Sequence, residues 1–114
     1  MNYTVTDVPL KKIQMIFQAK HKCEHHKFAD GIEFMMYTIT ARKKETLFIF
    51  DLEDFDVING REWYGTRNYI KCVGQNGYAD MHLIYVIGDK QYPDKNVALK
   101  KYGPDYRKSN FVVY

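Results

Sequence analysis

Cysteine and long apolar runs are scarce in this chain of 114 residues, and each scarcity excludes a class of protein. Its two cysteines, Cys23 and Cys72, are too few for a disulfide framework and favour a reducing compartment. No apolar run approaches the roughly 20 residues that span a bilayer. Lys11 and Lys12 precede only a short mixed stretch, which is not a signal-peptide pattern. We therefore expect a cytoplasmic protein with no membrane partner.

Excess charge is also small, since 17 Lys and Arg against 14 Asp and Glu leave a formal net charge of +3. Such a balance permits nucleic-acid contact but lacks the dense basic face of a dedicated DNA binder. Aromatic residues are abundant at 16%, with ten tyrosines. Because tyrosine offers contact area at low entropic cost, the excess is typical of an interaction surface. The alternative is a small β-rich core with tyrosine at its rim.

The pattern of apolar residues predicts an α+β fold, a small mixed domain of β-hairpins and short helices. A helix is expected over residues 8–20, capped by Asp7, followed by a polar connector over 21–26. A second helix is expected after Asp51 as N-cap, and a third over 81–86, stopped by Gly88. Strands are expected at residues 32–40, 46–50, 63–64, 69–73, 77–79, 96–99 and 111–114, with 69–73 and 77–79 forming a hairpin.

Two motifs near the C-terminus stand at a specific spacing: Met81-His82-Leu83-Ile84, and Pro104-Asp105-Tyr106-Arg107-Lys108-Ser109-Asn110-Phe111. Upstream, in order, come Phe48-Ile49-Phe50-Asp51, Glu53-Asp54-Phe55, Glu62-Trp63-Tyr64 and Asn76-Gly77-Tyr78-Ala79. From about Gly31 to the end, this succession resembles the small HNH (His-Me finger) endonucleases of phages of low-GC Gram-positive bacteria. The resemblance implies one domain over 1–114, with an N-terminal helical arm (1–30) and an HNH-like region (31–114). That region would end in a shortened ββα-metal-like motif.

The resemblance also implies that the catalytic residues are missing. Counting back from Asn110 by the family's spacing places Ala98 at the general-base histidine and Val97 at the metal-binding aspartate. Neither side chain can take a proton or bind a cation. The family's last metal ligand would fall past Tyr114. We therefore expect a catalytically inactive nuclease fold without metal or other cofactor, in which Asn110 ties the hairpin loop together.

Basic and aromatic residues interleave around the lost active site, a composition that suits nucleic-acid backbone or an acidic protein surface. The alternative is a solubilising face. The expected binding residues are Tyr92, Lys95, Lys100, Lys101, Tyr102, Tyr106, Arg107 and Lys108.

The resulting hypothesis is a phage or mobile-element protein that inhibits a host defence nuclease by occlusion, of the anti-CRISPR type. Its partner would be a Cas effector nuclease or its ribonucleoprotein, in the cytoplasm of the host cell. One alternative is a non-catalytic DNA-binding module. Another is a metal-dependent nicking endonuclease with His82 or His25 as a relocated base. The oligomeric state and the identity of the partner stay open.

Three further groups favour ordinary structural roles. Cys23, His25 and His26, with Cys72 as a distant ligand, lack the paired cysteine spacing of zinc sites, so a solvated loop is preferred. The acidic residues after Asp51 are expected to complement a helix dipole instead of holding metal. These residues are Glu53, Asp54 and Asp56. The run Arg42-Lys43-Lys44 is expected at a solvated hairpin tip.

Overall fold

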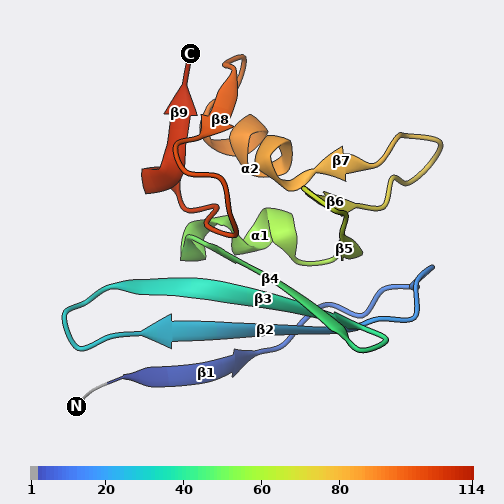
Figure 1. Ribbon diagram of the computed structural model, residues 1–114, viewed down its shortest axis with the longest axis horizontal. Coiled ribbons are helices and arrows are strands. Elements are labelled where there is room, and N and C mark those ends of the chain that lie inside the picture. Colours follow the sequence, from blue (N-terminus) through green and yellow to red (C-terminus); the bar gives the residue numbers. More distant parts are fainter. Residues whose placement is uncertain (1–2) are drawn as a thin grey trace.

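The computed structural model describes residues 3–114, which form three antiparallel sheets and two short helices (Figure 1). The largest sheet has the strand order β1-β2-β3-β4, the second β5-β6-β7 and the third β8-β9. The α+β fold class is therefore confirmed. In chain order the elements are β1 (Thr4–Val8), β2 (Lys20–Lys27), β3 (Glu33–Ala41), β4 (Lys44–Phe50), the 3₁₀ turn η1 (Leu52–Asp54), α1 (Phe55–Ile58), β5 (Trp63–Gly65), β6 (Ile70–Cys72), β7 (Met81–His82), α2 (Leu83–Gln91), β8 (Val97–Leu99), the 3₁₀ turn η2 (Lys108–Asn110) and β9 (Phe111–Val113).

One face of the four-stranded sheet is apolar because alternate residues of β3 and β4 are hydrophobic. Met35 and Tyr37 of β3 lie opposite Phe50 and Phe48 of β4, and all four are buried. The rings of Tyr37 and Phe48 stack with centroids 5.1 Å apart. The two predicted strands of this hairpin are confirmed, and Arg42 turns the chain between them with φ 60°.

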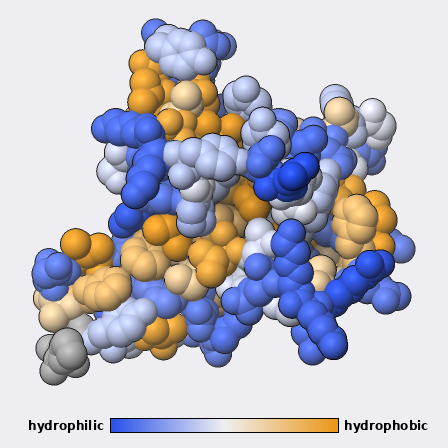
Figure 2. Space-filling view, in the orientation of Figure 1, coloured by the Kyte–Doolittle hydropathy of each residue, from blue (hydrophilic) through white to orange (hydrophobic). Residues whose placement is uncertain are grey.

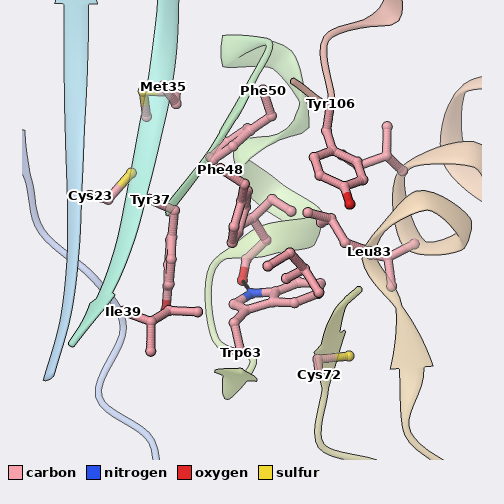
Figure 3. Packing of buried hydrophobic residues seen from close by; sticks show 14 of the residues in the cluster. Cys23, Met35, Tyr37, Ile39, Phe48, Phe50, Trp63, Cys72, Leu83 and Tyr106 are labelled. Carbon is pink, nitrogen blue, oxygen red and sulfur yellow. Dashed lines mark hydrogen bonds between the residues drawn. The ribbon is translucent and has the colours of Figure 1, made fainter. Parts of the chain in front are cut away.

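The other elements pack on this face through a cluster of buried side chains (Figure 3). Trp63 lies with its ring centroid 5.8 Å from that of Phe48, and its Nε1 donates a hydrogen bond of 2.8 Å to the carbonyl oxygen of Ile58. Helix α2 contributes Leu83 and Ile87, both fully buried. The two smaller sheets and both helices are thereby held together above the large sheet.

The helix predicted over residues 8–20 is wrong. Thr4–Val8 form edge strand β1, Pro9 follows, and the chain is irregular as far as Lys20. Proline disfavours helical backbone at the residue before it, and Val8 pairs instead with Cys23. Met1 and Asn2, the start of the predicted arm, lie outside the described residues.

The polar connector predicted over 21–26 is also wrong, because these residues lie inside β2, between β1 and β3. Cys23 and His25 face one side of the sheet, and His26 faces the other. Nδ1 of His26 is hydrogen-bonded to the hydroxyl of Tyr3, whereas Nε2 of His25 lies 3.1 Å from Oε1 of Glu33. A strand that separates these side chains does not gather them around one ion.

The hairpin predicted between 69–73 and 77–79 has a different second strand. β6 pairs with Met81–His82, Cys72 lying opposite Met81, and the segment between them forms a loop. Asp80 closes this loop by accepting a hydrogen bond of 2.7 Å from the Gly74 amide. A Cβ at Gly74 would lie 2.0 Å from the Tyr78 carbonyl oxygen, so only glycine permits this closure.

The two predicted helices in the second half are confirmed in place and corrected in detail. The carboxylate of Asp51 caps no helix; it accepts a hydrogen bond of 2.8 Å from the Lys108 amide. Helix α2 begins at Leu83, after the short strand β7, and continues past Gly88 to Gln91. At nine residues it is the longest helix described, and none in residues 3–114 has the length and apolar character to cross a membrane.

Candidate binding surface

Asn110 fixes the loop between β8 and β9. Its Nδ2 donates to the carbonyl oxygens of Lys101 (3.0 Å) and Asp105 (2.9 Å), and its Oδ1 accepts from the Lys101 amide (3.1 Å). The Asn110 carbonyl oxygen also accepts from the Lys100 amide at 2.7 Å. The predicted tie across this hairpin loop is confirmed. These hydrogen bonds, which we call the Asn110 clamp, set the backbone conformation of residues 100–102. Three of the predicted binding residues lie in this stretch.

The residues at the expected base and ligand positions face apolar surroundings. Val97 is buried and packs against Gly88 of α2, where a Cβ would lie 2.8 Å from Val97 Cγ2. Ala98, half-buried, lies opposite Val112 in the hairpin. Across residues 3–114, no group of three or more His, Cys, Asp or Glu side chains is placed to hold a metal ion.

The eight predicted binding residues divide into three groups in the structure: two packed tyrosines, two paired cations and four exposed residues. Tyr106 is buried at 8% exposure, edge-on to Phe48, and burial raises the pKa of its hydroxyl (Figure 3). Its side chain belongs to the core and is not available to a partner. Tyr92 is half-buried against Phe111, with ring centroids 6.2 Å apart. The rings of both tyrosines therefore pack against other aromatic side chains of the protein.

Two of the predicted cations are already paired. Arg107 makes two hydrogen bonds of 2.9 Å to the carboxylate of Asp105, which hold the pKa of that carboxyl below its usual range. The Arg107 guanidinium also lies 5.5 Å from the ring centroid of Phe34. Lys108 forms an ion pair with Glu53, which raises the pKa of the lysine. Their charges are largely neutralised by these partners.

The other four predicted residues are exposed: Lys95, Lys100, Lys101 and Tyr102. Tyr102 is 67% exposed, and its hydroxyl donates to the carbonyl oxygen of Asn68. This bond joins the β8–β9 loop to the turn between β5 and β6, which Thr66 closes through hydrogen bonds with Tyr69. A hollow of about 180 Å³ lies between the two segments, with Tyr106 in its lining.

From that turn, exposed aromatic rings continue to the start of α2. Tyr69 is 53% exposed, and its ring meets His82 edge-on at 5.0 Å. His82 in turn meets Tyr85, 51% exposed, edge-on at 5.8 Å. We call the four residues Tyr102, Tyr69, His82 and Tyr85 the tyrosine strip.

Cations accompany the tyrosine strip. Lys71 lies directly opposite His82 in the sheet, and Arg67 is exposed in the turn beside Tyr69. Lys100 and Lys101 adjoin Tyr102. Within the described part of the chain, none of these four cations forms an ion pair. The strip therefore combines exposed rings with cations that form no ion pair.

One acidic side chain close to this surface, Asp80, is already engaged. Asp80 accepts hydrogen bonds from the Tyr64 hydroxyl and the Gly74 amide, which lower the pKa of its carboxyl. Burial and the same Asp80 bond raise the pKa of Tyr64 to about 12. Asp80 thus stabilises the β6–β7 loop through these two hydrogen bonds.

Sequence reasoning missed Arg67, Tyr69, Lys71 and Tyr85. One signal was present, since His82 and Tyr85 are three residues apart and adjoin on a helical start. The junction between Asn68 and Tyr102 has no local signal, because 34 residues separate them. Among the described residues His82 has no side-chain hydrogen bond, and its ring is in contact with the rings of Tyr69 and Tyr85.

Comparison with protein-family models, with curated proteins and with solved structures finds no match.

Proposed function

We propose that this chain is a non-catalytic protein with an HNH-like frame. It acts by binding, as an inhibitor of the anti-CRISPR type that occludes a nucleic-acid-guided host defence nuclease. The observation that carries the proposal is the tyrosine strip with its unpaired cations. It adjoins the hairpin in which Val97 and Ala98 stand at the expected ligand and base positions.

The hairpin geometry supports binding over catalysis. An ionised aspartate at Val97 would be buried against α2, where a charge without a partner is costly. Asn110 nevertheless preserves the shape of the adjoining loop through three side-chain hydrogen bonds. A loop held so firmly beside apolar positions is suited to presenting Lys100, Lys101 and Tyr102 to a partner.

The composition of the surface indicates what it contacts. Exposed tyrosine rings stack on nucleobases or on flat protein surfaces, and lysines and arginines pair with phosphates or carboxylates. A positively charged strip would be repelled by the basic channel in which a nuclease holds its substrate. We therefore infer that the inhibitor contacts the nucleic acid carried by the ribonucleoprotein, or an acidic face of the effector.

A cleavage assay tests the proposal. Purified protein is mixed with a panel of guided effectors, and cutting of a labelled target is followed over time. Slower cutting by at least one effector is expected. The double variant Tyr69→Ala/Tyr102→Ala should weaken inhibition by more than about tenfold, because aromatic anchors dominate interface energies.

Tyr78→Ala is the matched control, since Tyr78 is 79% exposed but lies in the β6–β7 loop, outside the strip. It should inhibit as the unmodified chain does. Unchanged cutting across the whole panel would refute the inhibitor proposal.

One observation favours a second candidate, a single-strand nucleic-acid-binding module. Exposed rings at Tyr69, Tyr85 and Tyr102 lie near cations, which is the composition of a stacking platform. Fluorescence anisotropy with a labelled oligonucleotide should then show affinity that falls steeply between about 50 and 200 mM salt. Undetectable or salt-insensitive binding would count against this candidate.

A further inference from the structure

The irregular segment between β1 and β2 is held in place by a buried carboxylate. Glu62 is 3% exposed; its Oε1 accepts a hydrogen bond of 2.8 Å from the Ile16 amide, and its Oε2 one of 2.7 Å from the Phe17 amide. Lys11 is fixed by a neutral side chain, its amide donating to Asn59 Oδ1 at 2.8 Å, whereas both Glu62 bonds are charge-assisted. Charge-assisted bonds of this kind are strong when the carboxylate is shielded from water. The backbone of this segment is therefore pinned inward.

The side chains of the same residues point the opposite way. Ile16 is 71% exposed, Phe17 48% and Met15 39%, so three consecutive large apolar residues meet solvent. The Phe17 ring rests on Tyr64 with centroids 5.3 Å apart, which supports it without covering it. We call Met15, Ile16 and Phe17 the apolar tip. Scattered exposed hydrophobic residues are ordinary, but a contiguous group held outward indicates an interaction site.

Cations surround the apolar tip. Lys44 and Phe17 line one hollow, and Lys12 and Met15 line another. Lys20 lies opposite Thr40 at the end of β3, next to the turn into β4. Cations at this end of the molecule include Lys11, Lys12, Lys20, Arg42, Lys43 and Lys44, and in residues 3–114 none of these six forms an ion pair.

Few carboxylates oppose these cations. Glu45, exposed, follows the β3–β4 turn, and Glu62 is buried beneath the tip. Residues 8–23 contain no Asp or Glu. In Figure 1 the segment 9–19 and the β3–β4 turn share one end of the molecule, and Figure 2 shows hydrophobic side chains there beside extended hydrophilic ones.

We propose that the apolar tip inserts into the interfacial region of an anionic lipid membrane. Apolar side chains ringed by lysine and arginine match the layered chemistry of that surface, where acyl chains lie beneath negative headgroups. The tip projects outward, and a pinned backbone avoids the entropic cost of ordering a loop on binding. Interfacial binding needs no spanning segment, so this proposal replaces the expectation of no membrane contact and goes beyond the proposed inhibitor function.

Vesicle flotation with the full chain tests this inference. Unmodified protein should float with vesicles of mixed phosphatidylglycerol and phosphatidylcholine, and stay behind with phosphatidylcholine alone. Raising the salt concentration should weaken the association. The double variant Ile16→Ser/Phe17→Ser keeps both backbone bonds to Glu62 and should lower the bound fraction on the order of tenfold, because most of the inserted apolar area is lost.

Ile32→Ser is the matched control. Ile32 is 52% exposed in the turn between β2 and β3, and its replacement should leave flotation unchanged. Absence of flotation with anionic vesicles would overturn the inference, as would equal losses in the Ile32 and tip variants. The same tip variant is run in the cleavage assay. If the unmodified chain ignores vesicles and the tip variant loses inhibition, the tip belongs to the protein partner and the membrane assignment fails.

Discussion

Replacing Asn110 with alanine should destabilise the protein and loosen the loop that carries Lys100 to Tyr102. The substitution removes three side-chain hydrogen bonds, two donated to carbonyl oxygens and one accepted from an amide. Each bond contributes about 0.5–1.5 kcal/mol net, and the half-exposed site lets water replace part of the loss. We therefore expect unfolding to require about 2 kcal/mol less.

Urea unfolding followed by tryptophan fluorescence measures this change. Trp63 is the single tryptophan and is 1% exposed, so its emission reports loss of the core. Asn110→Asp should be at least as harmful as Asn110→Ala, because a carboxylate would face the carbonyl oxygens of Lys101 and Asp105. Ser109→Ala, at an exposed neighbouring position, is the control. A difference below about 0.5 kcal/mol between Asn110→Ala and the control would refute the clamp.

Three more predictions concern Gly88, Arg107 and Cys23. Gly88→Ala should destabilise the protein by about 1–3 kcal/mol in the same urea assay, although alanine favours helices, because its Cβ would lie 2.8 Å from Val97 Cγ2. Arg107→Gln should flatten the acid limb of a stability–pH curve. Arg107 lowers the folded-state pKa of Asp105, so the stabilisation is present above the ordinary aspartate pKa of about 4 and is lost as pH falls through the lower folded value. Cys23 should resist thiol reagents in the native protein, because burial raises its pKa to about 12.

A specific result would contradict each of these three predictions. The control for Gly88→Ala is Asp89→Ala, a substitution at an exposed position of the same helix. A Gly88→Ala protein as stable as Asp89→Ala would show that Val97 moves aside without cost. An unchanged acid limb in Arg107→Gln would remove the role given to the pair with Asp105. Thiol labelling at neutral pH that proceeds faster than unfolding would contradict the burial of Cys23, and of Cys72 if that site is the one modified.

Local sequence by itself determined the elements whose periodicity matched their packing. The alternation through Met35, Tyr37 and Ile39, with Phe48 and Phe50 across a short polar turn, dictates a hairpin with one buried face. The loop-tying role of Asn110 was expected from the resemblance and not from local pattern, and the hydrogen bonds that bear it out join residues at most nine positions apart. Resemblance to HNH nucleases stays a prediction.

The N-terminal segment shows where local pattern misleads. Leu10, Ile13, Ile16 and Phe17 have helical spacing, yet an isolated helix of this length is marginal without a surface to bury its apolar face. Here Glu62, 45 and 46 residues away in the chain, holds the Ile16 and Phe17 amides instead. Patterns among neighbouring residues do not predict hydrogen bonds over such a separation.

The candidate surface depended still more on tertiary structure. Sequence placed basic and aromatic residues near the β8–β9 loop, but burial removed Tyr106 from the surface and ion pairing engaged Arg107 and Lys108. Packing of the small sheets joined Tyr102 to Asn68, the neighbour of Tyr69, and brought both Tyr69 and Tyr85 into contact with His82. Periodicity reports how each segment meets its immediate neighbours, whereas exposure and charge pairing depend on segments that meet only when the whole chain has folded.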